Sequence, residues 1–118
     1  MITGCTLRMT RGRPRAMRRA MDEWMAKRRR NQPLSLPSAG CVFKNPAGDS
    51  ARRLIGLAGL RGKKIGGAQV SAKHANFIVN RGGATARDVL ALARLVQAGV
   101  ARELGIELVP EVRLVGER

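Results

Sequence analysis

The sequence predicts an α+β domain, close to α/β in the order of its elements, with a small sheet packed against two to three helices. The length of 118 residues is that of one domain. Short apolar segments bounded by glycine or proline alternate with stretches of helical apolar spacing. The expected order is strand, helix, loop, helix, strand, strand, helix and strand.

The first elements are a strand and a basic helix. Residues 2–9 alternate loosely between apolar and polar side chains, which predicts a short strand. Pro14 suits the first turn of a helix, and residues 15–30 have helical spacing. The apolar side chains of that helix share one face: Met17, Met21, Trp24 and Met25. The opposite face is almost entirely arginine.

A loop and a short helix follow. Residues 31–40 contain two prolines and are expected to form an extended loop, and residues 41–43 a very short strand. Asp49 or Ser50 can cap a helix over residues 51–60, which ends near Gly59.

The second half predicts three strands around one long helix. Residues 61–70 are a basic, glycine-rich loop that runs into a strand, and residues 74–80 form the next strand. Residues 106–116 are strand-like but are interrupted by Pro110.

The clearest predicted helix spans residues 85–104. Thr85 and Asp88 have the spacing of a capping box, with Asp in place of Glu. Gly105 ends the helix. Gly99 lies inside it at a cost of roughly 1 kcal/mol relative to Ala, which suggests a close packing contact there.

The charge predicts an anionic partner. The formal net charge is +15, and residues 1–30 hold ten Lys or Arg against two acids. Nucleic acid, an acidic surface or a phosphorylated small molecule fits this excess. Two cysteines and one histidine form no metal-binding pattern. There is no membrane-spanning run and no signal-peptide core, so we expect a cytoplasmic protein.

Cys41 is the first candidate for chemistry. A ligand can reach a thiol beside a loop glycine, and Lys44 can lower its pKa. Such a thiol can act as a nucleophile or as a proton donor. A small buried hydrophobe is the plainer interpretation of the residue taken alone. Cys5 has no comparable neighbours.

Other candidates are weaker when taken singly. Lys44 and Asn45 can bind phosphate, a base or a sugar, or they can be ordinary loop residues. Glu111 can act as an acid or an electrostatic partner, although alternation favours a solvent-facing strand residue. The glycine-rich loop 62–68 can cradle phosphate, but close packing is commoner. His74 is more typical of packing than of catalysis.

Three segments taken together resemble one family. QPLSLPSAGCVFKNP, AGLRGKKIGGAQVSAKHANFIVNRGGATARDVLAL and LVPEVRLVGE occur in this order. They resemble the C-terminal domain of UDP-N-acetylenolpyruvoylglucosamine reductase, also called UDP-N-acetylmuramate dehydrogenase (the MurB family). The likeness runs from about Gln32 to Glu117.

The resemblance implies a function and a role for four residues. In this family NADPH reduces FAD, and the enolpyruvyl group of a UDP-sugar is then reduced to give UDP-N-acetylmuramate for peptidoglycan synthesis. The family's proton donor, a serine or in some members a cysteine, falls on Cys41. Its intermediate-stabilising glutamate falls on Glu111, and substrate-binding positions fall on Lys44 and Asn45. Proton donation requires a neutral thiol, which argues against a strongly lowered pKa for Cys41.

The resemblance also implies a domain division. Residues 1–12 resemble the last strand of an FAD-binding domain, residues 13–31 form a basic connecting helix, and residues 32–118 form the UDP-sugar-binding and catalytic domain. The FAD site itself is not expected in this chain, which alone should neither bind FAD tightly nor turn over. The alternative is a small basic nucleic-acid-binding protein that uses the Arg-rich helix. Binding to RNA with a steep salt dependence would favour that alternative.

Overall fold

The computed structural model describes residues 2–116, and the chain divides into two compact units, Met1–Arg30 and Asn31–Arg118. Helix α1, Pro14–Asn31, lies in the first unit apart from its last residue, and it forms where it was predicted. Pro14 begins the helix, where its missing N–H has no intrahelical partner to lose. None of the residues of α1 is buried.

The strand predicted over residues 2–9 is wrong. These residues carry no strand assignment, and the side chain of Ile2 is 92% exposed. A strand needs a hydrogen-bonded neighbour, and an alternating pattern alone supplies none.

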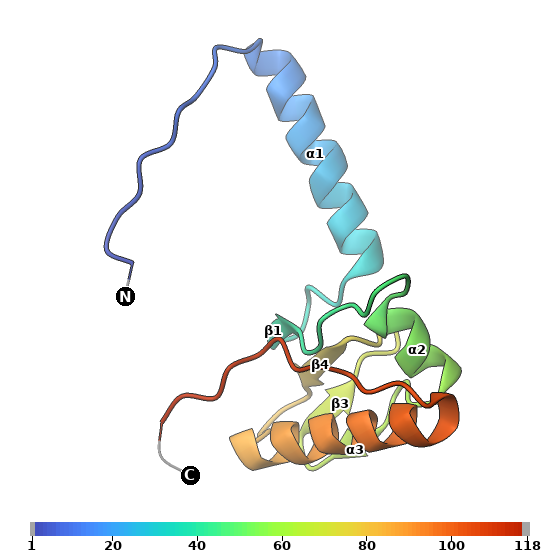
Figure 1. Ribbon diagram of the computed structural model, residues 1–118. Coiled ribbons are helices and arrows are strands. Elements are labelled where there is room, and N and C mark those ends of the chain that lie inside the picture. Colours follow the sequence, from blue (N-terminus) through green and yellow to red (C-terminus); the bar gives the residue numbers. More distant parts are fainter. Residues whose placement is uncertain (1, 117–118) are drawn as a thin grey trace. The chain divides into compact units, whose positions relative to one another are not determined.

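The second unit is built on a four-stranded antiparallel sheet in the order β1-β4-β3-β2 (Figure 1). Its strands are β1 Ser38–Cys41, β2 Lys64–Ile65, β3 Ala68–Val70 and β4 Phe77–Asn80. β4 is central and is buried at its first three residues, which explains its continuous apolar run. This sheet, together with the three helices found in residues 2–116, confirms the predicted α+β class.

Two predicted strand boundaries are corrected. β1 starts inside the predicted loop, at Ser38, because the carbonyl of Pro37 accepts the N–H of Asn80 at 2.9 Å and starts the pairing with β4. Cys41 is the last residue of β1, so the predicted strand 41–43 does not form. Residues 106–116 pair only through one bridge between Phe43 and Pro110. The bonds of this bridge come from the flanking N–H groups of Lys44 and Glu111, so the N–H that Pro110 lacks is not needed there.

The helices begin where their caps predict. α2, Ala51–Leu57, is capped by Ser50, whose Oγ accepts the N–H of Arg53 at 3.3 Å, and it ends at Leu57, before Gly59. The flanking Asp49 binds Arg53 instead.

α3, Ala86–Leu104, has the predicted capping box between Thr85 and Asp88. Gly105 follows it in the left-handed conformation at φ 67°.

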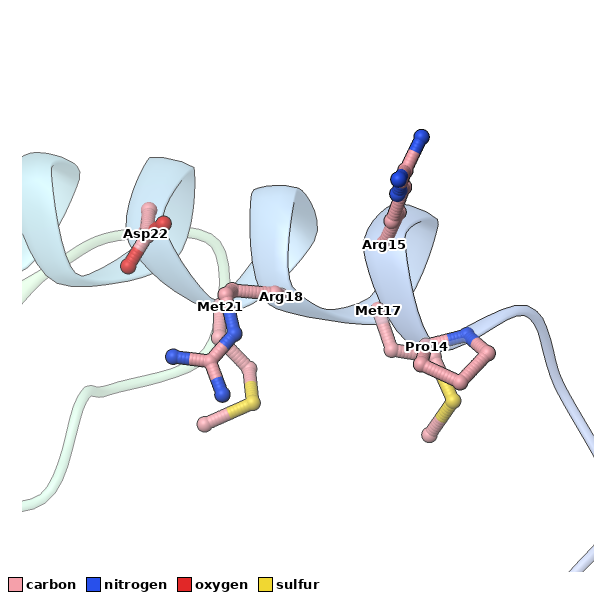
Figure 2. A pocket seen from close by; sticks show the side chains of 6 residues that line it. All are labelled: Pro14, Arg15, Met17, Arg18, Met21 and Asp22. Atoms are coloured by element: carbon pink, nitrogen blue, oxygen red, sulfur yellow. The ribbon is translucent and has the colours of Figure 1, made fainter.

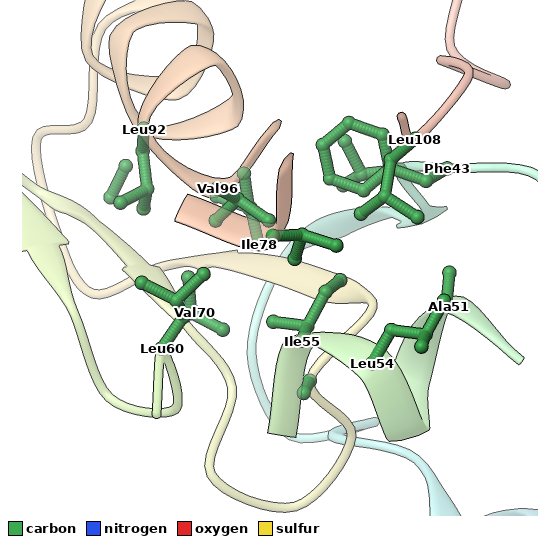
Figure 3. Packing of buried hydrophobic residues seen from close by; sticks show 14 residues of the cluster. Phe43, Ala51, Leu54, Ile55, Leu60, Val70, Ile78, Leu92, Val96 and Leu108 are labelled. Carbon is green, nitrogen blue, oxygen red and sulfur yellow. The ribbon is translucent and has the colours of Figure 1, made fainter. Parts of the chain in front are cut away.

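The core lies between the sheet, α2 and α3. Leu92 and Val96 of α3 point toward Val70 and Ile78 of the sheet (Figure 3). Gly99 lets α3 approach the loop after α2, because a Cβ there would lie 2.9 Å from Leu60 Cδ1. The close contact suggested by that glycine is therefore present.

The glycine-rich segment 62–68, predicted as a loop, contains β2 and the first residue of β3, and packing explains one of its glycines. A Cβ on Gly67 would lie 2.4 Å from the backbone nitrogen of Ala84 and the backbone oxygen of Gly82. Only a residue without a side chain fits there, so close backbone packing accounts for this glycine.

Candidate functional site

The candidate site is built on the segment Cys41–Asn45. On one side the N–H of Val42 donates to the carbonyl of Asn76 at 2.9 Å. On the other side the carbonyl of Val42 accepts the N–H of Glu111 at 2.8 Å, and the N–H of Lys44 donates to the carbonyl of Val109 at 2.8 Å. The segment is thus fixed between Asn76, which directly precedes β4, and residues 109–111.

A bulge aims Cys41. Where β1 pairs with β4, Ser38 lies opposite Val79 and Cys41 lies opposite Phe77. Between these two pairs β1 has one more residue than β4. Gly40 in this bulge has a φ of 85°, which favours glycine. Bulges re-aim side chains and end regular pairing, and Cys41 is the last residue of β1.

The environment of Cys41 favours the neutral thiol. Burial raises the pKa of the Cys41 thiol, and the negative charge of Glu111 raises it further. A hydrogen bond from the Asn76 side chain acts in the opposite direction on that pKa. Cys41 is half-buried and free, whereas Cys5 is exposed and free. The positive charge of Lys44, three positions along the chain, is not among the causes of the shift.

Glu111 lies beside Cys41 although the two are far apart in sequence. Its backbone is fixed by the bond to Val42 and follows the bridge between Phe43 and Pro110. Its side chain is exposed, so a ligand can reach the carboxylate. The structure therefore brings a thiol and a carboxylate together in surroundings that favour the neutral form of the thiol.

Lys44 and Asn45 line a pocket next to this pair. The other residues that line the pocket are Pro46, Glu107 and Val109. The Asn45 Oδ1 accepts the N–H of Ala51 at 3.0 Å, which ties the pocket wall to the first turn of α2. Asn45 therefore has a structural role as well as a place in the pocket. The pocket presents a cation, an amide and a carboxylate.

Two residues of the site were not singled out from the sequence. Asn76 is 3% exposed and bonds both the N–H and the carbonyl of Phe43 through its side chain. A polar residue inside the apolar run 75–79 was the available signal, because buried amides must find partners. Glu107 lies in a predicted strand, and nothing in the sequence marked it as a pocket residue.

His74 packs beside the sheet. Its ring lies 4.7 Å from that of Phe77 in an edge-on arrangement. Burial lowers the pKa of His74, and the positive charge of Arg52 lowers it further. Both effects favour a neutral ring, in keeping with a packing role.

The first unit has a separate hollow along α1. It is lined by Pro14, Arg15, Met17, Arg18, Met21 and Asp22. Met17 and Met21 extend from the same side of the helix, and Arg15 points away from them (Figure 2). All of these residues come from one helix, so the hollow carries none of the site chemistry described above.

The fold and the site define a small α+β domain that presents a neutral thiol and a carboxylate beside a polar pocket. Within residues 2–116, no helix is long and apolar enough to cross a membrane. Comparison with known proteins identifies the family of this domain. The family model described as the C-terminal domain of UDP-N-acetylenolpyruvoylglucosamine reductase matches residues 32–115.

Individual relatives agree with this match. The chain is 59% identical over 103 residues to the UDP-N-acetylenolpyruvoylglucosamine reductase of Heliobacterium modesticaldum, which covers 86% of this chain and 33% of the relative. It is 49% identical over 116 residues to the enzyme of that name from Myxococcus xanthus, covering 98% of this chain and 37% of the relative.

A solved structure is also similar. The crystal structure of UDP-N-acetylenolpyruvylglucosamine reductase from Thermus caldophilus matches with a TM-score of 0.68 and 47% identity, covering 83% of this chain and 35% of that one. The chain belongs to the UDP-N-acetylenolpyruvoylglucosamine reductase (MurB) family through its C-terminal domain. It spans about a third of the length of the curated relatives it matches.

Proposed function

We propose that this chain is the substrate-binding and proton-donating part of an enzyme that reduces UDP-N-acetylglucosamine enolpyruvate to UDP-N-acetylmuramate for peptidoglycan synthesis. One observation carries the proposal. Glu111 is held next to Cys41 by its bond to Val42 and raises the pKa of the thiol, and the pocket of Lys44 and Asn45 lies beside both residues. A reduction across a carbon–carbon double bond needs a hydride at one carbon and a proton at the other.

Cys41 supplies the proton in this proposal. The donor must still hold its proton at neutral pH, and burial together with Glu111 raises the pKa of Cys41 in that direction. The half-buried position keeps the thiol within reach of a ligand while limiting its ionisation. The bulge at Gly40 fixes the direction from which the proton arrives.

Glu111 is the group proposed to stabilise the enol-type intermediate that forms when the hydride arrives. Its exposed carboxylate can accept a hydrogen bond from the enol hydroxyl of that intermediate until Cys41 delivers its proton to carbon. The negative charge of the same carboxylate holds the proton on Cys41 until the adjacent carbon can accept it.

Lys44 and Asn45 hold the UDP-sugar in this proposal. The ammonium of Lys44 suits a diphosphate, and the amide of Asn45 suits a carbonyl or hydroxyl group. Glu107 in the same pocket can accept a hydrogen bond from a hydroxyl. A sugar nucleotide presents all of these groups.

The described part of the second unit offers no exposed phenyl ring on which a flavin could stack. The phenyl rings of that unit belong to Phe43 and Phe77, which are 2% and 6% exposed, so neither can stack on a flavin. We propose that FAD and NADPH bind in the region of the relatives that this chain does not span, and that they supply the hydride. Residues 1–12 then belong with that region, residues 13–31 connect to it, and residues 32–118 form the substrate domain. The two free thiols suit the reducing cytoplasm.

A chimera tests the proposal. Residues 32–115 of this chain replace the matching part of the Thermus caldophilus enzyme, and NADPH oxidation is measured with and without the enolpyruvyl UDP-sugar. We expect substrate-dependent oxidation that Cys41→Ala abolishes and that Cys41→Ser partly retains. The control Ser38→Ala, at an exposed position of β1, should leave the oxidation unchanged. Full activity of Cys41→Ala would show that the assigned role of Cys41 is wrong. The 118-residue chain alone should show no oxidation.

A further inference from the structure

The buried side chain of Asn76 holds the backbone of Phe43. Its Oδ1 accepts the N–H of Phe43 at 2.9 Å, and its Nδ2 donates to the carbonyl of Phe43 at 2.8 Å. Both backbone groups of one residue are therefore satisfied by one amide, as a neighbouring strand would satisfy them. The residue is 3% exposed, so water does not compete for these bonds.

These bonds lie at the centre of the site. The backbone carbonyl of Asn76 also accepts the N–H of Val42, so Asn76 holds two consecutive residues of the segment that follows Cys41. The opposite edge of that segment holds Glu111 through the carbonyl of Val42. A displacement of residues 42 and 43 would therefore move Cys41 and Glu111 relative to each other.

We propose that Asn76 is a positioning residue that keeps Cys41 and Glu111 in register by fixing the backbone of Phe43. This inference rests on the proposed function for its catalytic meaning, but the spatial coupling that it asserts can be measured without any turnover. The side chain of Asn76 is also close enough to act on the thiol directly.

Asn80, the last residue of β4, is a matched control for Asn76, which directly precedes that strand. Its Oδ1 accepts the N–H groups of Gly82 at 2.8 Å and Ala84 at 3.2 Å, so it also anchors backbone through one amide. It touches neither Phe43 nor Glu111 through these bonds. Asn80→Ala removes a comparable anchor at the far end of β4.

The test measures how strongly Glu111 acts on the thiol of Cys41. In the full chain carrying Cys5→Ser, the rate of iodoacetamide alkylation is measured at a fixed mildly alkaline pH with and without Glu111→Gln. With Asn76 present, Glu111→Gln should speed alkylation, because removing the carboxylate lowers the pKa of the thiol. When Asn76 is replaced by Ala, the alkylation rate with Glu111→Gln divided by the rate without it should fall to about one. This is the loss of coupling that a double-mutant cycle detects.

Asn80→Ala should keep the wild-type ratio. A general loss of stability would lower folding in both arms of the cycle, whereas a positioning role changes the ratio only when Asn76 is replaced. An unchanged ratio in Asn76→Ala would overturn the proposal, and so would an equal loss of the ratio in Asn80→Ala.

A second measurement keeps the proposal testable if Asn76→Ala does not fold. Amide hydrogen exchange of the unaltered chain should show the N–H groups of Phe43 and Glu111 exchanging together, about tenfold or more slower than an unprotected amide. A protected Phe43 beside a freely exchanging Glu111 would contradict the proposed link.

In the chimera, Asn76→Ala should lower kcat more than it raises KM, since the pocket of Lys44 and Asn45 is held by separate bonds. If the chimera is inactive with every residue in place, the proposed function fails. The alkylation ratio still decides the role of Asn76.

Discussion

Glu111 donates its backbone N–H to the carbonyl of Val42 at 2.8 Å, one residue after Cys41, and its negative charge raises the pKa of the Cys41 thiol. Val42, the residue after Cys41, is bonded to Asn76 through its N–H and to Glu111 through its carbonyl. The position of Glu111 relative to Cys41 depends on the geometry of residues 41–43 and of Pro110. Changes at these residues should therefore alter the reactivity of the Cys41 thiol.

Replacement of Glu111 by Gln should lower the pKa of Cys41, because the carboxylate is one of the causes that raise it. In the Cys5→Ser background, the pH profile of alkylation should shift toward lower pH. Glu107→Gln is the matched control, since Glu107 lies in the pocket but is not among the causes of the shift. A profile that does not move in Glu111→Gln would contradict the assigned proximity.

The raised pKa of Cys41 also predicts how stability depends on pH. The folded chain holds the thiol proton more tightly than the unfolded chain, whose thiol has the ordinary value of 9.0. The contribution to stability is therefore complete below pH 9 and is lost as pH rises through the folded pKa. Urea unfolding of Cys41 and Cys41→Ser chains, both carrying Cys5→Ser, should give a difference in free energy that shrinks above pH 9. A constant difference across that range would argue against a raised pKa.

Gly40→Ala should destabilise the chain by about 1–2 kcal/mol, because an L side chain is strained in the left-handed region. The space around Gly40 is open, so backbone strain is the whole cause. Thermal unfolding measures this change, and Ser38→Ala at the exposed start of β1 should stay within about 0.5 kcal/mol of the starting protein. Equal stability of the two variants would mean that the bulge at Gly40 relaxes without cost.

Gly67→Ala should be more damaging, at about 3 kcal/mol, because its Cβ would meet backbone atoms of Gly82 and Ala84 that cannot rotate away. Urea unfolding of this variant can be compared with Gly4→Ala, where a Cβ meets nothing within 4 Å. A Gly67→Ala chain as stable as the control would show that the 82–84 turn moves freely.

The features predicted best from the sequence are the helix ends, which depend on residues close together in the chain. The capping box of Thr85 and Asp88 and the terminating Gly105 each depend on a few neighbouring residues, and α3 formed with those ends. Likewise, Pro14 correctly marked the start of α1.

Strand pairing was harder, because it depends on partners that are distant in the chain. Residues 2–9 have a suitable alternation but form no strand in the described part of the chain. Ser38–Cys41 follows a proline and still pairs, because β4 lies beside it. Among the described residues of the last segment, pairing is limited to the bridge between Phe43 and Pro110.

The candidate site was predicted in part for the same reason. Cys41, Lys44 and Asn45 are close in sequence, and motif resemblance linked them to Glu111. Neither periodicity nor composition pointed to Asn76, whose importance comes from burial and from two bonds to Phe43. Glu107 joined the pocket through tertiary folding alone.

The hydrogen bond from the N–H of Ala51 to Asn45 Oδ1 determines which hydrogen-bonding group Asn45 offers in the pocket. With its Oδ1 engaged by α2, Asn45 has its NH2 group left to offer a ligand, which makes it a donor, and Lys44 is a donor as well. Glu107 offers only acceptors when ionised. A ligand with acceptors at one end and hydroxyl donors at the other can therefore satisfy the pocket in one orientation and not in the reverse, so the pocket itself selects which end of the molecule faces Cys41.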